Sequence, residues 1–263
     1  MDFQGKGLAL SQLGIDNATR PIGVSPAELW TVLKVETSGC GFLPDRRPVI
    51  LFERHVFHRL TQGQFDDGDI SDATPGGYGA TGAHQFDRLT RAIAMDRGAA
   101  LQSASWGMGQ IMGENHTRAG FADVEIMVSN IVGSEDNQLI PVASFLRSTG
   151  LAVALSKHDW QSFARGYNGP HFAANHYDTR LAAVFAALTL HGVPDLTVRA
   201  SQLYLTYLGF NPGPVDGVMG AKTMAAVQGF CIGAGRSTIN TIDDVFVQAL
   251  LDALDGQAKA ATT

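Results

Sequence analysis

Apolar positions recur with a helical period along most of this chain, so mostly helices are expected. A short helix is predicted from Ser105 through Met112, in addition to the longer helical runs given below. One apolar run, residues 49–52, is the strand candidate. A polar stretch rich in Gly and Asp, residues 62–85, indicates a long surface loop. One strand region among many helices predicts a mostly α (α+β) fold. The helical runs cover residues 26–38, 86–102, 114–149 (with interruptions expected near Gly133 and Pro141), 151–165 and 177–190.

The helix predicted near residue 26 has clear end signals. Ser25 is followed by Pro26 and then by Glu28, which is a capping box with proline at the first helical position. Gly39 and Gly41 favour a stop at the other end. The helix is therefore expected to begin at Pro26 and to end just before Gly39.

One acidic side chain, Glu36, falls on the apolar stripe of this helix. Leu29, Val32, Leu33 and Glu36 stand at positions i, i+3, i+4 and i+7. Apolar neighbours and the negative end of a helix dipole both raise the pKa of a carboxyl group, which suits a general acid at neutral pH. The alternative is a glutamate at the helix edge that reaches past the core to an ion pair. The residues of this helix alone do not separate the two.

Composition and charge exclude several classes of function. The chain has 263 residues, 45% of them hydrophobic, with a formal net charge of −6. An acidic chain without a basic run gives no reason to expect nucleic-acid binding. No apolar stretch approaches the roughly 20 residues that span a bilayer, so no stable membrane insertion is expected. The N-terminus lacks a secretory signal pattern, and two cysteines 191 positions apart fit a protein made in a reducing cytoplasm.

Two further motifs carry polar groups suited to sugars. Ser105 is a candidate helix N-cap, and Gln110 after it can offer an amide to a hydroxyl or N-acetyl group. Tyr167 and Asn168 end a helical run before a Gly-Pro turn and offer a stacking ring and an amide. Each motif also has a structural interpretation, as tight packing or as a helix end. The order and spacing of these motifs after Glu36 favour a common site.

These residues resemble the lysozyme and lytic transglycosylase superfamily, and most closely the N-acetylmuramidase domain of phage endolysins. Three patterns of that family are found in this chain. The pattern around the acidic residue matches residues 35–43, and Arg-Pro-x-x-Leu-Phe-Glu-Arg-His matches residues 47–55. Ser-Trp-Gly-x-x-Gln-Ile-Met-Gly matches residues 105–113. The resemblance covers roughly residues 10–190. It implies a lysozyme-like fold with a small β region and cleavage of the β-1,4 bond between N-acetylmuramic acid and N-acetylglucosamine, with Glu36 as general acid.

Three possibilities stay open for the second carboxylate. Glu53 follows the predicted strand, and Asp45 lies in the loop before it. We favour Glu53 because a strand fixes a side chain better than a loop does. The third possibility is a lytic transglycosylase, which needs one glutamate and leaves 1,6-anhydro ends.

Metal and cofactor chemistry is not expected. His55 and His58 stand three positions apart and suggest a zinc-dependent stem-peptide amidase as an alternative. The chain has no His-Glu-x-x-His motif, and no motif links its other histidines. We therefore predict half-buried structural histidines, no metal and no cofactor.

The C-terminal part resembles the small three-helix peptidoglycan-binding module of wall hydrolases. The match runs from Leu203 to Phe230, with a predicted turn at Asp216-Gly217 and a helix from Thr223. The loop from Asn211 to Lys222 is the expected ligand-contacting segment. Such a module raises the local concentration of substrate.

Together these features predict a catalytic domain over residues 1–193 and a peptidoglycan-binding domain over residues 194–263. We expect a monomer with limited contact between the two domains. A phage endolysin of this kind accumulates in the host cytoplasm and reaches the wall after a membrane lesion such as a holin pore, so a holin is an indirect partner. A wall-binding protein without activity is a further alternative, against which the intact Glu36 motif argues.

Overall fold

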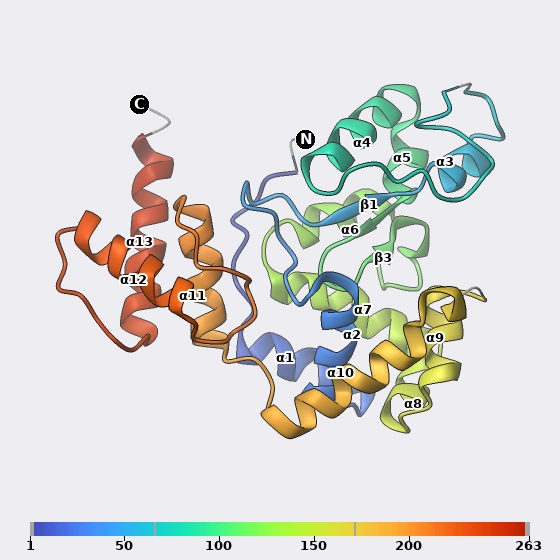
Figure 1. Cartoon of the computed structure of the whole chain (residues 1–263). Coiled ribbons are helices and arrows are strands. Elements are labelled where there is room, and N and C mark those ends of the chain that lie inside the picture. Colours follow the sequence, from blue (N-terminus) through green and yellow to red (C-terminus); the bar gives the residue numbers. More distant parts are fainter. Residues whose placement is uncertain (1–2, 66, 171, 261–263) are drawn as a thin grey trace.

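The structure is a computed structural model that describes residues 3–65, 67–170 and 172–260. Its helices form a larger group that runs to α10 and a smaller group of α11, α12 and α13 (Figure 1). Each group has its own cluster of buried apolar side chains. The mostly α fold class with a small β region is confirmed.

The helices predicted for the larger group are largely present, with additional breaks. α1 (Gln12–Thr19) is not among the predicted helices. The others are α2 (Pro26–Thr37), α3 (Arg54–Leu60), α4 (Ala83–Met95), α5 (Arg97–Gln102), α6 (Val124–Ile131), α7 (Glu135–Ser148), α8 (Leu151–Ser156), α9 (Trp160–Asn168) and α10 (Tyr177–His191), with 3-10 turns at Arg20–Ile22, Gly113–Asn115 and Phe172–Asn175.

Two of the predicted helices are each divided in two. Asp96 separates α4 from α5, because its carboxylate accepts the backbone N–H of Ala99 and so begins a new helix. Asp159 begins α9 in the same way, by accepting from Ser162. The break predicted near Gly133 is confirmed, but Pro141 lies inside α7 without ending it. The buried face of α7 packs in the core and keeps the helix continuous there.

The capping signals of α2 act as the sequence predicts. The hydroxyl of Ser25 accepts from the Glu28 backbone N–H, and the Glu28 carboxylate accepts from the Ser25 backbone N–H at 2.6 Å. Leu29, Val32 and Leu33 are fully buried. The helix ends at Thr37, followed by Ser38 and Gly39 in left-handed conformations. Glu36 therefore lies in the last turn of a well-anchored helix.

A three-stranded antiparallel sheet stands where one strand and one short helix were predicted. Its strands are β1 (Ile50–Phe52), β2 (Ala104–Trp106) and β3 (Ile111–Met112), in the order β1-β2-β3. The predicted helix at 105–112 is wrong: Ser105 pairs with Met112 across a hairpin. The hairpin turn needs left-handed backbone at Gly107 and Gln110, which a helix does not accommodate.

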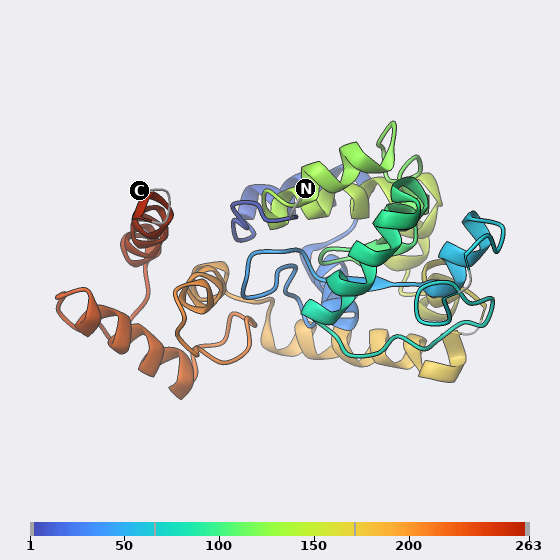
Figure 2. The ribbon, with the colours of Figure 1, turned by 90° about the horizontal axis from the view of Figure 1, so that it is seen from above.

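The smaller group contains α11 (Leu196–Tyr207), α12 (Ala221–Gly233) and α13 (Asp244–Ala260). Of these, α11 lies nearest the larger group, as the second view shows (Figure 2). Within the described residues no single helix is long and apolar enough to cross a bilayer, and α10 and α11 meet those limits only as a pair bent by 115°.

Among the described elements, no helix of the smaller group packs extensively on a helix or strand of the larger one, but the contacts that do join the two parts are specific and polar. Arg199 of α11 is fully buried and forms a bidentate ion pair with the fully buried carboxylate of Glu135 at the start of α7. Arg199 also donates to the carbonyl of Gly39 at 3.0 Å, just beyond the end of α2. The hydroxyl of Tyr204 accepts from the backbone N–H of Ala9 at 2.9 Å. The two parts are therefore joined by buried polar contacts.

Candidate active site

A cleft of about 430 Å³ brings together most of the predicted site residues. It lies where the end of α2, the three-stranded sheet, the loop before α4 and the end of α9 meet. Asp45 is not among the lining residues. Those residues are Glu36, Leu51, Glu53, Tyr78, Ser105, Gln110, Met112, Tyr167, Asn168 and Asn175.

The surroundings of Glu36 favour the protonated form of its carboxyl group up to about neutral pH. Burial raises the pKa of its carboxyl group from 4.5 to about 7, against the opposing effects of a hydrogen bond from Tyr177 and of the positive charge of Arg180. The hydroxyl of Tyr177 donates to Oε1 of Glu36. Arg180, one turn further along α10, donates to the carbonyl of Val35 at 2.9 Å. The start of α10 therefore orients the end of α2.

Tyr177 and Arg180 are contacts that the sequence pattern does not indicate. Tyr177 is buried and opens a run that is otherwise rich in Ala and Leu. A lone phenol at the start of an apolar helix is the only signal available, and it does not point to a residue 141 positions away. Pairing of α10 with α2 brings the two together.

Glu53 occupies the position directly after β1. Burial raises the pKa of its carboxyl group, and the nearby His55, Tyr78 and Arg88 oppose that rise by favouring the charged form. Its Oε2 lies 3.2 Å from Nδ1 of His55. Glu36 and Glu53 are thus two acidic groups of raised pKa that line one cleft.

Tyr78 reaches the cleft from the long loop and is also absent from the sequence-based prediction. Its phenol lies beside the Glu53 carboxylate and favours the charged form of that acid, and burial together with the Glu53 charge raises the pKa of Tyr78. Its backbone carbonyl accepts from Gln85 at 2.7 Å and from the buried guanidinium of Arg88 at 3.1 Å. The loop is therefore fastened at this point to α4, and its aromatic side chain is aimed at the second acid.

Ser105 and Gln110 line the cleft but bond mainly to each other and to backbone. The Ser105 hydroxyl donates to Oε1 of Gln110 at 2.8 Å. The amide nitrogen of Gln110 donates to the carbonyls of Gly107 at 2.9 Å and Val49 at 3.2 Å. Gln110 thus closes the β2–β3 hairpin with both ends of its amide. Ser105 lies in β2 and is not a helix N-cap.

Tyr167 and Asn168 are the last residues of α9, and their side chains differ in whether they are bonded to the rest of the protein. The hydroxyl of Tyr167 donates to the carbonyl of Gly109 at 2.6 Å, and its ring stacks on Phe163. Asn168 is exposed in the cleft. The side chain of Asn168 is therefore available to a ligand, whereas Tyr167 holds the hairpin turn against α9.

Asp45, His55 and His58 are also candidates from the sequence, and each contacts a different neighbour. The carboxylate of Asp45 pairs with Arg47 at 2.6 Å on an exposed loop. His55 contacts Glu53, and Nδ1 of His58 lies 3.1 Å from the hydroxyl of Ser71. Among the described residues, no group of three or more His, Cys, Asp or Glu side chains is arranged to hold a metal ion.

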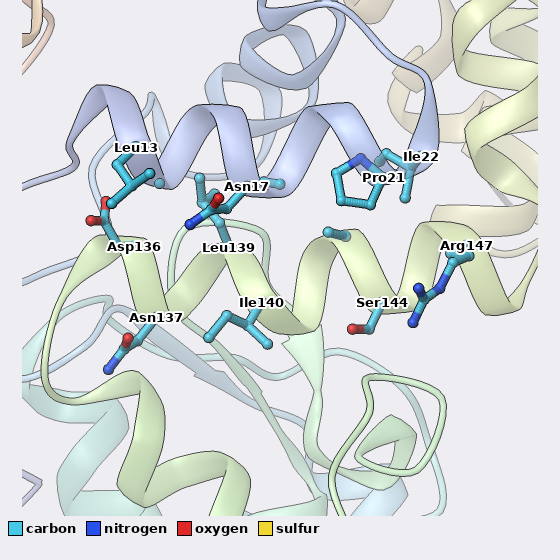
Figure 3. Close-up of a pocket in the computed structure, with 13 residues that line it drawn as sticks. Leu13, Asn17, Pro21, Ile22, Asp136, Asn137, Leu139, Ile140, Ser144 and Arg147 are labelled. Atoms are coloured by element: carbon cyan, nitrogen blue, oxygen red, sulfur yellow. The ribbon is translucent and has the colours of Figure 1, made fainter.

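A second hollow, the groove between α1 and α7, has a different character (Figure 3). Leu13, Pro21 and Ile22 on one side face Leu139 and Ile140 on the other. Its acidic residue, Asp136, accepts hydrogen bonds from the backbone and hydroxyl of Ser11. This carboxylate serves the start of α1, so the Glu36 cleft is the candidate active site.

Comparisons with known proteins agree on the kind of protein this chain resembles. Residues 25–189 match the family model for N-acetylmuramidase, and residues 195–230 match that for a putative peptidoglycan binding domain. A crystal structure of Burkholderia AP3 phage endolysin is similar, with a TM-score of 0.62 and 34% identity over 69% of this chain and 71% of that chain. No protein of curated function matches.

Proposed function

The chain belongs to the N-acetylmuramidase family of peptidoglycan-degrading glycoside hydrolases, and from this we propose that it cleaves the β-1,4 bond between N-acetylmuramic acid and N-acetylglucosamine. The observation that carries the proposal is Glu36, an acid whose pKa is raised to about 7 by burial in a cleft with exposed polar groups. Glycosidic cleavage needs a carboxylic acid that still holds its proton at the working pH.

In the proposed mechanism, Glu36 protonates the glycosidic oxygen through Oε2. Tyr177 donates to Oε1, so that oxygen acts as an acceptor and the acid proton belongs on the other oxygen. The same hydrogen bond fixes the orientation of the carboxyl group. Asn168 and Tyr78 offer an amide and a phenol to the sugars, while Ser105, Gln110 and Tyr167 shape the cleft through the hairpin.

Glu53 is the proposed second carboxylate, in preference to Asp45. Glu53 lines the cleft with Glu36; burial raises the pKa of its carboxyl group, while His55, Tyr78 and Arg88 act against that rise by favouring the charged form. A charged carboxylate at this place can activate water or stabilise positive charge on the sugar ring. Asp45 is paired with Arg47 outside the cleft, so we assign it no catalytic role.

We further propose that residues 1–193 are the catalytic domain and residues 194–263 the wall-binding domain of a phage endolysin. The similarity to a phage endolysin and the match to a peptidoglycan-binding family support this assignment. The protein would act as a monomer, accumulate in the host cytoplasm, and reach the wall once another phage protein opens the membrane.

The test is mass spectrometry of the muropeptides released from purified sacculi by the wild type, Glu36→Gln and Glu53→Gln. Reducing N-acetylmuramic ends from the wild type and none from Glu36→Gln are expected, because the amide keeps the shape and has no acid proton. Anhydro ends would identify a lytic transglycosylase. Cut stem peptides, or full release by Glu36→Gln, would overturn the proposal.

The Glu53→Gln variant tests whether Glu53, and not Asp45, is the second catalytic carboxylate. If Glu53 activates water or stabilises charge, turnover falls by about 10²-fold or more while sacculus binding is kept. Asp45→Asn is the matched control, and it should retain wild-type turnover. The reverse result would exchange the assignments of Glu53 and Asp45.

A further inference from the structure

We propose that the stem peptide of peptidoglycan binds in the groove between α10 and the turn of residues 216–219, so that both parts of the chain form one wall-binding site. This inference rests on the proposed function, because it takes peptidoglycan as the ligand. It adds the place of binding, the part of the polymer that is recognised, and the contribution of the larger group of helices.

The groove is a hollow of about 540 Å³ at the junction of the two parts. One wall comes from α10 and from Lys34 of α2, and the other from the turn of the smaller group. The connecting segment closes one side. The lining residues are Lys34, Val184, Ala187, Leu188, His191, Gly192, Val193, Pro194, Asp195, Asp216, Gly217, Val218 and Met219.

The turn is built as a rigid wall. The buried amide of Gln202 accepts from the backbone N–H groups of Asp216 and Gly217 at 3.0 and 2.9 Å. Asp216 in turn accepts from the backbone N–H of Val218 at 2.9 Å. Gly217 has φ +73°, and a Cβ there would lie 2.7 Å from the carbonyl oxygen of Asp195. The turn is thus packed directly against the connecting segment.

Buried contacts of α11 keep the two walls of the groove at a fixed separation. The ion pair of Arg199 with Glu135 and the hydrogen bond from Arg199 to Gly39 tie α11 to the larger group near the end of α2. The hydroxyl of Tyr207 adds a bond to the carbonyl of Gly7 at 3.1 Å. Because these contacts are buried, the groove exists before any ligand arrives.

The side chains of the groove suit a short peptide with methyl groups and a carboxylate. Val218 and Met219 are 61% and 39% exposed, although they are apolar. Exposed apolar side chains gathered around a hollow are typical of binding sites. Lys34 forms no ion pair within the described residues, so its ammonium can receive a carboxylate of the ligand. The two acidic side chains of the groove accept hydrogen bonds from the protein itself, Asp195 from the start of α11 and Asp216 from Gln202 and Val218. Stem peptides of alternating L- and D-residues offer alanine methyls and free carboxylates.

The same side chains argue against a sugar as the occupant. Sugar-binding sites use aromatic faces and amides, and the Glu36 cleft has Tyr78, Tyr167 and Asn168. No Phe, Tyr, Trp, Asn or Gln side chain is among the residues that line the groove, and its one aromatic ring is the imidazole of His191. The two hollows therefore bind different parts of the polymer: the glycan binds in the cleft of Glu36, and the stem peptide binds in the groove.

The first experiment measures binding in the Glu36→Gln background, where the ligand is not consumed. The probes are a soluble stem tetrapeptide (L-Ala, D-Glu, a diamino acid, D-Ala), the same peptide as its C-terminal amide, and chitotetraose. Calorimetry should show binding of the tetrapeptide that survives an excess of chitotetraose and weakens about tenfold for the amide. Binding of chitotetraose at the groove, or no binding of the peptide, would overturn the proposal.

Matched variants then locate the site. Val218→Asp in the turn and Ala187→Glu on α10 should each weaken tetrapeptide binding and sacculus pull-down about tenfold or more. The controls are Ile232→Asp, at a residue exposed like Val218 but on α12 outside the groove, and Ala186→Glu, at the neighbour of Ala187. Both should bind as the parent does. Loss with Val218→Asp alone would restrict the site to the smaller group and refute a shared site.

These results are independent of those for the proposed function. Binding is measured with a variant that lacks the acid, so the type of end produced by the wild type does not enter. If product analysis shows anhydro ends, the proposed bond chemistry fails while peptide binding is untouched. If the peptide does not bind, the muramidase assignment stands and this inference fails.

Discussion

At the scale of single residues, the proposed chemistry depends on the opposing effects of burial and of nearby donors on the pKa of Glu36. Burial raises the pKa of its carboxyl group to about 7, while Tyr177 and Arg180 limit that rise by stabilising the charged form. A group tuned in this way holds a proton at neutral pH and can still release it. The hydroxyl of Tyr177 therefore sets both the orientation and the acidity of Glu36.

Replacing Tyr177 with Phe tests this role. The variant loses a hydrogen bond to a charged group, so the pKa of Glu36 should rise by about one unit. The alkaline limb of the activity–pH profile should then move to higher pH, because the protonated acid persists longer. Tyr204→Phe, which removes a phenol far from Glu36, is the control. An unchanged alkaline limb in Tyr177→Phe would remove Tyr177 from the site.

The raised pKa of Glu36 also carries a cost in stability. The folded chain binds the proton with a pKa of about 7 and the unfolded chain with the ordinary value of 4.5. Between these values the folded state holds more protons, so the stability of the wild type falls as pH rises through this window. Below about pH 4.5 no such loss exists, and above pH 7 it is complete.

Glu36→Gln should therefore be more stable than the wild type at pH 8, by about 3 kcal/mol, and similar to it at pH 4. The amide has no charge to bury, and Tyr177 can still donate to its oxygen. Thermal unfolding of both proteins at the two pH values measures the difference. Equal melting temperatures at pH 8 would mean that the Glu36 carboxylate is well solvated.

At the scale of elements, both ends of α2 fix the position of Glu36: the cap at its first turn and the residues that follow its last turn. The capping box of Ser25 and Glu28 fixes where the helix begins, and the buried stripe fixes which face turns inward. Together these two features place residue 36 in the last turn of the helix, on its inward side. The hairpin of β2 and β3 lines the same cleft and is closed by the amide of Gln110.

Replacing Ser25 with Ala should destabilise the protein by about 1 kcal/mol, because the backbone N–H of Glu28 loses its acceptor. Urea unfolding measures the change. Activity at temperatures well below unfolding should be kept, since Glu36 lies at the other end of α2. Ser237→Ala, on an exposed loop, serves as the control. A loss of stability no larger than that of the control would show that the cap is dispensable.

At the scale of the whole molecule, the buried pair of Arg199 and Glu135 joins the two parts. Glu135 also accepts from the backbone N–H groups of Leu10 and Gly41, both at 2.9 Å, so one carboxylate gathers three segments. A carboxylate in this position requires its guanidinium partner. The two parts should therefore unfold as one cooperative unit.

Arg199→Met should lower the free energy of unfolding by about 3–5 kcal/mol, because it leaves the Glu135 charge buried without its partner. The double variant Arg199→Met/Glu135→Gln should recover part of this loss. Arg97→Met breaks the exposed pair with Glu125 and should cost less than about 1 kcal/mol. Urea unfolding followed by fluorescence and by circular dichroism decides: two separate transitions in the wild type would contradict the single unit.

The sequence predicted local features better than distant contacts. The start of α2 and its buried stripe depend on residues within two turns, and both are confirmed. The segment 105–112 was predicted as a helix, because the left-handed backbone at Gln110 and the pairing of Ser105 with Met112 have no local signal. Tyr78, Tyr177 and Arg180 were missed for the same reason.

By itself, the sequence determined the helical class of the fold, the position of Glu36 on a buried face, and the motifs that mark the family. These depend on periodicity, capping and short spacings, which act over a few residues. Only the tertiary structure decided the pKa of Glu36, the separation of Asp45 from the cleft, and the union of the two parts through Arg199. Burial and ion pairing are properties of side chains that folding brings together from distant positions, so no local pattern contains them.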